Sequence, residues 1–333
     1  MTVTSNGFAR HMLCGLRILV AIFGLTSMAS CTSSSSAPDP NAGGSEIIGN
    51  QLPSALLGVW TREWIRRPGV AVTDQNAVQN SPLVVRYLQT PEFFGDMRFP
   101  VDRPDLSRAS SFNDLTDEEL RALSKQQGFF GYTTVVKDSN SGEPSRPPSG
   151  PTVQWHRQMD FEPPTSNLDI GRLDFLSADL MNESAPDDSY TERWVSITNG
   201  ENRFFVVYTE HIGRLDRMLL VAGDQFFYGR NRAKDLPPAP SLDSLLSGAS
   251  RGQMIEYLDL ELSVGRVRGG LFPWEIQYST LPWREGKPAE FVRSIHVDDS
   301  TNKVTLSVGR DDTWKMPTNT LKPTDLRLLF PEK

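Results

Sequence analysis

Short runs in which apolar and polar residues alternate follow one another from residue 56 almost to the C-terminus. This alternation predicts β-strands, because successive side chains of a strand point to opposite faces. The runs predicted as strands are 56–66, 83–89, 93–99, 129–136, 152–161, 169–177, 190–197, 203–210, 214–221, 225–230, 254–264, 271–278, 291–297 and 303–308. Asn199 and Gly200 suit a tight hairpin turn, as do Gly223 and Asp224. Many short strands of this kind predict an all-β sandwich or barrel.

The first of these runs, LLGVWTREWIRR, has charged residues among the apolar ones on both faces. With strict alternation, Trp60, Arg62 and Trp64 share one face of the strand, and Glu63 lies among the apolar residues of the other. A half-buried strand would confine its charges to one face. A strand with charge on both faces suits a barrel with a partly polar lumen, or a barrel packed against a second one.

Two segments predict short helices. In residues 115–128, LTDEELRALSKQQG, Thr116 and Glu119 have the spacing of a capping box, and Gly128 is placed to end the helix. The apolar stripe is narrow and consists of Leu115, Leu120 and Leu123. We therefore expect this helix to lie over a barrel mouth as a lid. Residues 241–250 predict a second helix.

The first 30 residues have the features of a bacterial lipoprotein signal peptide. Arg10 and Arg17 precede an apolar run at 18–25 that is too short to span a membrane, and the sequence MASC then ends at Cys31. We expect Cys31 to be lipidated and to anchor the chain to the membrane; the alternative is a secreted protein with a free thiol. Residue 32 is Thr and not Asp, which favours the outer membrane of the cell envelope.

The remaining chain is divided by its composition. Residues 31–52 are rich in Ser, Pro and Gly and predict a flexible tether. Residues 53–200 and 201–333 are then expected to form a first and a second barrel. The formal net charge of −7 and the lack of a basic stripe exclude nucleic acid as a probable partner.

Common catalytic and metal-binding motifs are missing from the sequence. There is no G-x-S-x-G, no P-loop, no G-x-G-x-x-G and no H-E-x-x-H. The three histidines that follow the signal peptide, His156, His211 and His296, are far apart in the sequence. With Cys31 as the only other cysteine after Cys14, no internal disulfide forms in the mature chain. We expect no metal, no cofactor and no enzymatic activity.

Pairs of aromatic and charged residues two positions apart recur on the predicted strands, and each pair projects to one side. Asp160 follows the pair Trp155 and Arg157 closely in the sequence. Together with the pairs, it gives the candidate ligand-binding residues Arg62, Trp64, Asp96, Arg98, Trp155, Arg157, Asp160, Glu192 and Trp194. One interpretation is structural: these are ion pairs and cation–π contacts that fix strand register. The other is a barrel lumen with aromatic walls and a few convergent charges, which is typical of a small-molecule site.

Six of these residues are predicted to converge in the first barrel: Arg62, Asp96, Arg98, Trp155, Arg157 and Glu192. Three arginines against two acids leave one positive charge. That charge would suit the carboxylate or phosphate of an otherwise apolar ligand.

Several strings in the sequence resemble known proteins. Gly58-x-Trp60 is similar to the G-x-W motif of lipocalins. The ordered strings GVWTREWI, VRYLQTPEFFGDMRFPVDRP, GFFGYT, WHRQMDFEP, DIGRLDF, YTERW and STLPWREG resemble a bacterial lipocalin-like family of unknown function, related to a fungal protein-kinase-interacting protein. The resemblance spans residues 56–286 and implies two lipocalin-like antiparallel β-barrels side by side. It marks Asp96 with Arg98, and Trp155 and Arg157 with Asp160, as key positions, but it implies no catalytic residue.

Three functions fit these features. The first is an envelope lipoprotein that binds a small amphipathic or apolar ligand in a barrel. The alternative is a non-enzymatic protein-interaction module whose barrels are filled by side chains. A barrel enzyme using Asp96 or His156 with Arg98 is the third. A lumen of about 300 Å³ or more favours the first, and a filled lumen favours the second.

Overall fold

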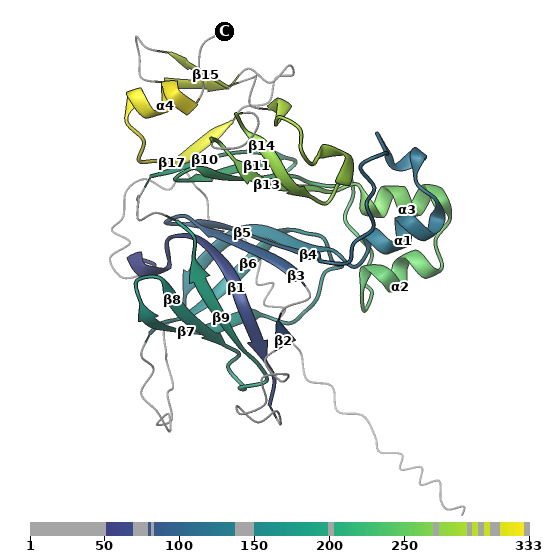
Figure 1. The fold of residues 1–333 in the computed structure, drawn as a ribbon, viewed down its shortest axis with the longest axis horizontal. Coiled ribbons are helices and arrows are strands. Elements are labelled where there is room, and N and C mark those ends of the chain that lie inside the picture. The colour runs from purple at the N-terminus through teal and green to yellow at the C-terminus, as the bar shows by residue number, and fades with distance from the viewer. Residues whose placement is uncertain are drawn as a thin grey trace, which may run out of the picture. The chain divides into compact units, whose positions relative to one another are not determined.

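The computed structural model describes residues 51–68, 79–80, 83–136, 150–198, 203–268, 273–291, 295–298, 303–306 and 314–329. Within them, eight antiparallel strands close into a barrel (Figure 1). They are β1 (Gly58–Arg66), β3 (Leu83–Gln89), β4 (Phe93–Pro100), β5 (Gln127–Val135), β6 (Thr152–Asp160), β7 (Asp169–Ser177), β8 (Leu180–Ser184) and β9 (Thr191–Ser196). Consecutive strands pair, and β9 pairs back with β1. This up-and-down order is the one found in lipocalin barrels. A two-residue strand, β2 (Gln79–Asn80), pairs antiparallel with β1 at Trp64 and Ile65.

The N-terminal side of β1 shows why the G-x-W motif has its form. Trp60 Nε1 donates to the carbonyl of Leu56, the last residue of the short helix η1 (Ser54–Leu56), at 2.8 Å. Gly58 has φ +125°, and a Cβ there would lie 2.5 Å from Thr198 Oγ1. Leu56 and Trp60 are buried among the lumen side chains. Apolar residues therefore fill this part of the lumen.

A β-bulge changes the predicted faces of β1. The pairing of β1 with β9 shifts register between Arg62 and Trp64, so that Arg62 lies opposite Trp194 and Trp64 opposite Arg193. A bulge adds one residue and reverses the alternation beyond it. Trp64 therefore shares the face of Arg193, whose guanidinium lies 4.9 Å from its ring centroid. The prediction that Trp64 shares a face with Arg62 is wrong.

The second half of the chain forms an open six-stranded antiparallel sheet. Its strands, in spatial order, are β14 (Glu275–Ser279), β13 (Glu261–Arg266), β12 (Gln225–Arg230), β11 (Arg214–Ala222), β10 (Phe204–His211) and β17 (Lys315–Asn319). β15 (Ile295–Asp298) and β16 (Lys303–Leu306) form a separate hairpin. The predicted second barrel is not closed in the described residues.

This sheet does not need to close into a barrel, because other parts of the chain already cover both of its faces. One face packs on the outside of the barrel. The other packs against Trp274 and the helix α4 (Pro323–Leu329), which contributes Leu326 and Leu329. An antiparallel sheet closes or stacks to bury an apolar face, and here two separate cores achieve this.

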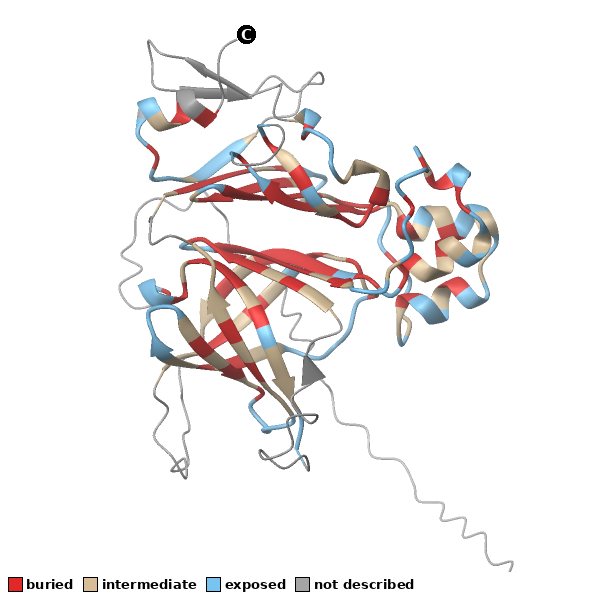
Figure 2. Ribbon diagram, viewed as in Figure 1, coloured by how far each residue is buried: buried red, intermediate tan, exposed pale blue. Residues whose placement is uncertain are grey.

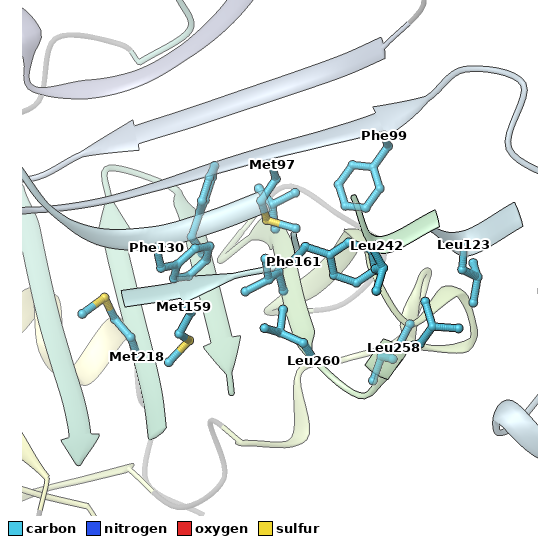
Figure 3. Close-up of a cluster of buried hydrophobic side chains, with 14 of the residues drawn as sticks. Met97, Phe99, Leu123, Phe130, Met159, Phe161, Met218, Leu242, Leu258 and Leu260 are labelled. Atoms are coloured by element: carbon cyan, nitrogen blue, oxygen red, sulfur yellow. The ribbon is translucent and has the colours of Figure 1, made fainter. Parts of the chain in front are cut away.

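A continuous apolar core joins the barrel and the sheet. Met97, Phe130 and Met159 on the outer face of the barrel belong to the same buried cluster as Met218 and Leu260 of the second half. Figure 3 shows these side chains gathered between the two sheets. Figure 2 shows the facing sides of the two sheets as mostly buried. Barrel strands such as β4 are therefore buried on both faces, one toward the lumen and one toward the sheet. This explains why charge and apolar residues mix in their sequences.

Three short helices pack together beside the two sheets: α1 (Asp117–Leu123), α2 (Leu242–Ser247) and α3 (Arg251–Leu258) (Figure 1). The predicted capping box of Thr116 and Glu119 is present at α1. The helix ends at Leu123 and not at Gly128, which lies in β5. Its apolar stripe joins the core between barrel and sheet and not the cluster of lumen residues. The prediction of a lid over the barrel mouth is therefore wrong.

Candidate functional site

Four of the predicted site residues form a buried ion-pair network in the barrel lumen: Arg62 from β1, Asp96 and Arg98 from β4, and Glu192 from β9. Arg98 binds Asp96 through two parallel hydrogen bonds, Nε to Oδ1 at 2.9 Å and Nη2 to Oδ2 at 3.0 Å. Arg62 Nη1 donates to Glu192 Oε1, and Arg98 Nη1 lies 3.9 Å from the same oxygen. Because little water reaches these side chains, each charge is balanced by an opposite charge within the network.

A fifth charged residue, Glu183 of β8, belongs to this network and was not anticipated from the sequence. It lies opposite Glu192 in the β8–β9 ladder and is buried. Burial, followed by the charge of Glu192, raises the pKa of Glu183 well above that of an exposed glutamate. Tyr190 Oη donates to Glu183 Oε1 at 3.1 Å. The two arginines of the described lumen face the acidic side chains Asp96, Glu183 and Glu192, so the predicted surplus positive charge does not arise there.

A second network of uncharged groups fills the lumen beside the ion pairs. Trp155 Nε1 donates to Tyr87 Oη at 3.0 Å, and Tyr87 Oη donates in turn to Gln89 Oε1. Thr133 Oγ1 donates to the same Gln89 oxygen at 2.8 Å. Gly171 makes room for the indole, since a Cβ there would lie 2.7 Å from the Trp155 ring. Trp155 therefore occupies the lumen as a packed and hydrogen-bonded side chain.

Little empty space is left among these groups. The cavity found between them has a volume of about 20 Å³, and residues of both networks line it, including Tyr87, Asp96, Arg98, Trp155 and Glu183. A cavity of this size holds about one water molecule. Trp194, another predicted residue, is buried beside it with its ring centroid 5.8 Å from that of Tyr87. The described lumen is filled by side chains.

The remaining predicted residues, Arg157 and Asp160, lie at the edge of the barrel. Arg157 Nη1 lies 3.1 Å from Asp160 Oδ2, and Arg157 Nη2 lies 2.8 Å from the Oδ2 of Asp169. The Arg157 guanidinium also lies 3.5 Å from the ring centroid of Phe129. Its side chain is 31% exposed, so it marks the boundary between the lumen and solvent.

Outside the lumen, a groove of about 710 Å³ runs along β6. One wall consists of residues 154–158 and Asp160, and the opposite side consists of residues 164–169 except Ser166, together with residues from the second half of the chain. Tyr132 and His156 line it as a stacked pair, with ring centroids 4.4 Å apart and an interplanar angle of 9°. Burial lowers the pKa of His156, which keeps its ring neutral near pH 7.

Each basic side chain of the groove lining is bound within the protein, three to carboxylates and Arg232 to backbone carbonyls. Arg157 binds the two aspartates described above, Arg214 lies 2.9 Å from Asp235, and Lys234 lies 2.6 Å from Glu256. Sequence reasoning missed this groove because Arg214 and residues 231–236, which complete its lining, meet residues 154–169 only in the folded chain.

The described residues contain no group of three or more His, Cys, Asp or Glu side chains placed to hold a metal ion. None of the helices in the described ranges has the length and apolar character needed to cross a membrane. Cys31, the signal peptide and most of the tether lie outside the described residues.

Comparisons with known proteins give one structural likeness. The chain is similar to the crystal structure of the uncharacterized protein YLR301w from Saccharomyces cerevisiae, with a TM-score of 0.46 and 10% sequence identity over 79% of this chain and 98% of that chain. No protein-family model matches the sequence. No curated protein matches it either.

Proposed function

We propose that this protein is a non-enzymatic, envelope-anchored interaction module: its barrel is a filled scaffold, and it binds a protein partner through the groove along β6. The observation that carries this proposal is the lumen cavity of about 20 Å³. Binding sites for small molecules typically have volumes of about 300 to 1,000 Å³. An amphipathic ligand in the barrel, the other function expected from the sequence, would have to displace buried side chains.

The energetics of the lumen favour the same function. Entry of a ligand would separate pairs such as that of Arg98 with Asp96, which is bidentate and has a buried carboxylate and an arginine side chain that is 21% exposed. Breaking a buried ion pair costs about 3 to 5 kcal/mol. An apolar chain has no groups to replace those contacts. The same pairing argues against an enzyme, because Asp96 and Arg98 are bound to each other and not poised toward an open site.

The groove has the properties expected of a recognition surface. Its volume of about 710 Å³ leaves room for side chains of another polypeptide. Leu168 is on its rim with 67% of its surface exposed. Lipidation of Cys31, with the tether of residues 31–52, would hold this surface near the outer membrane while leaving it accessible to an envelope protein.

Site-specific crosslinking in the native envelope tests the proposal. A photo-reactive phenylalanine analogue replaces either Asn167, which is exposed in the groove, or Glu118, which is exposed on α1. We expect a discrete protein adduct from position 167 and none from position 118. Equal adducts from both positions, or none from position 167, would contradict a partner in the groove.

A further inference from the structure

Over about half of the length of β6, one of its edges has no described strand beside it. The pairing of β6 with β7 covers only residues 152–155, and it ends where Trp155 lies opposite Asp169. On its other side, β6 pairs with β5 as far as Asp160. Among the described strands, none pairs with residues 156–160 on the β7 side. An open strand edge presents backbone hydrogen-bonding groups and is a template for pairing with another chain.

The sequence between β6 and β7 keeps this hairpin open. The connecting segment contains Pro163 and Pro164, which lack the N–H needed to join a β-ladder. Glu162 Oε2 accepts the backbone N–H of Leu242 at 2.8 Å, which ties the segment to the start of α2. The segment also lines a second hollow of about 860 Å³, together with residues 238–241. The segment is therefore held away from the edge of β6.

Arg232 fixes the point where the hairpin opens. Its Nη1 donates to the carbonyl of Asp160 at 2.5 Å, its Nη2 to that of Phe161 at 2.7 Å, and its Nε to that of Tyr257 at 2.5 Å. Burial lowers the pKa of Arg232 to about 10, so it stays charged near pH 7. A buried arginine that caps two carbonyls at the end of β6 holds the strand in an open arrangement.

The groove lies within this opened hairpin. Residues 156–158 and Asp160 of the open edge line one side, and 164, 165 and 167–169 of the returning segment line the other. Arg157, Arg214 and Lys234 are paired with carboxylates. Arg232 is bound to backbone carbonyls. No basic side chain of the described lining is therefore left without a partner for an anionic ligand. An extended backbone supplies neutral N–H and C=O groups, and its apolar side chains can contact Leu168 and Leu236 on the walls.

We propose that the partner binds as an extended polypeptide strand that pairs with residues 156–159 of β6 and inserts between β6 and the segment before β7. This inference rests on the proposed function and specifies its partner class. Recognition comes from main-chain hydrogen bonds to the edge, as in other cases of β-strand addition. The partner segment is uncharged or charge-balanced, with apolar side chains toward Leu168.

The test uses a library of random 12-residue peptides displayed on phage and selected against the full-length lipidated chain in detergent. Enriched peptides are measured against two matched variants, Leu168→Asp on the rim of the groove and Leu176→Asp, a comparably exposed leucine of β7 that does not line it. We expect Leu168→Asp to weaken binding by about tenfold or more and Leu176→Asp to leave it within about twofold.

The decisive experiment uses the peptide that binds most tightly, made in two forms. The backbone nitrogens carry methyl groups at the odd residues in one form and at the even residues in the other. A strand directs the N–H groups of alternate residues to one neighbour. One methylated form should lose about tenfold or more in affinity and the other should retain it within about threefold. Equal effects of the two forms, or no enriched peptide that responds to Leu168→Asp, would overturn strand pairing. If either outcome is found while position 167 still gives a protein crosslink, the proposed function stands and strand pairing is rejected as its mode of binding.

Discussion

At the scale of single residues, the ionisation of Glu183 decides how the lumen tolerates its charges. Glu183 faces Glu192 across two adjacent strands, and both are buried. Two carboxylates in such a position do not both ionise readily, so one keeps a proton. The hydrogen bond that Tyr190 donates to Glu183 Oε1 favours the ionised form, but burial and the charge of Glu192 outweigh it, and the pKa of Glu183 stays raised. Glu183 is therefore the acid of this network whose protonated form is favoured by its surroundings.

The substitution Glu183→Gln tests this assignment. The pKa of Glu183 is higher in the folded protein than in the unfolded chain. The stability that follows from its proton is thus complete below the unfolded pKa and is lost as the pH rises through the folded pKa. Glutamine resembles the protonated acid and does not ionise. We expect the variant to be more stable than the wild type at pH 8, with a difference that shrinks toward pH 4, as measured by urea denaturation across this range. A variant less stable at every pH would refute a protonated Glu183.

A substitution of Arg98 distinguishes the two interpretations of the lumen charges, a structural ion-pair network and a ligand-binding site. Replacing it by alanine leaves Asp96 buried without its bidentate partner, so we expect Arg98→Ala to lower the free energy of unfolding by about 3 kcal/mol. Arg193→Ala is the control: it removes an outward contact with Trp64 and should cost about 1 kcal/mol or less. Thermal denaturation with and without added fatty acid measures both effects. An unchanged melting temperature with loss of stabilisation by fatty acid would identify Arg98 as a ligand-binding residue.

At the scale of elements, β7 depends on a glycine that admits a side chain from its neighbour. Gly171 lies opposite Val153 of β6, and a Cβ there would lie 2.7 Å from the Trp155 ring and 3.0 Å from Glu183 Cγ. Glycine at position 171 of β7 therefore leaves the space in the lumen that the Trp155 indole occupies.

Gly171→Ala should destabilise the protein by about 1 to 3 kcal/mol, because the added methyl overpacks the filled lumen. The control Gly248→Ala adds the same methyl where nothing lies within 4 Å, and should change stability by less than about 1 kcal/mol. Chemical denaturation of both variants measures the difference. If Gly171→Ala is as mild as the control, the lumen is looser than described and has room for a ligand.

The alternation of residues predicted most strands but not every face. β3 and β7 have the predicted bounds, at 83–89 and 169–177. The run at 254–264 is different, because its first part is the end of α3 and only Glu261–Arg266 forms β13. Leu258, Leu260 and Leu262 are buried in either conformation, so burial alone did not distinguish helix from strand. The bulge after Arg62 has no sequence signal, and it turns Trp64 outward.

At the scale of the whole molecule, the sequence predicted four members of the lumen ion-pair network. It did not predict Glu183, the open second sheet or the groove. Spacing by two residues correctly put Asp96 and Arg98 on one side of β4, and Arg62 and Glu192 joined them as expected. Glu183 escaped notice because its place depends on the register of β8 against β9, which is set in three dimensions. The open second sheet and the groove likewise depend on contacts between distant segments.

Native mass spectrometry of the chain extracted from its own membranes tests the central claim, a barrel filled by its own side chains. We expect the folded protein to carry only its covalent lipid, and to acquire no stoichiometric adduct when fatty acids are added. This follows from a lumen cavity of about 20 Å³. A co-purifying lipid at one equivalent that is lost in Trp155→Ala or Arg98→Ala would contradict it and would make the lumen a binding site.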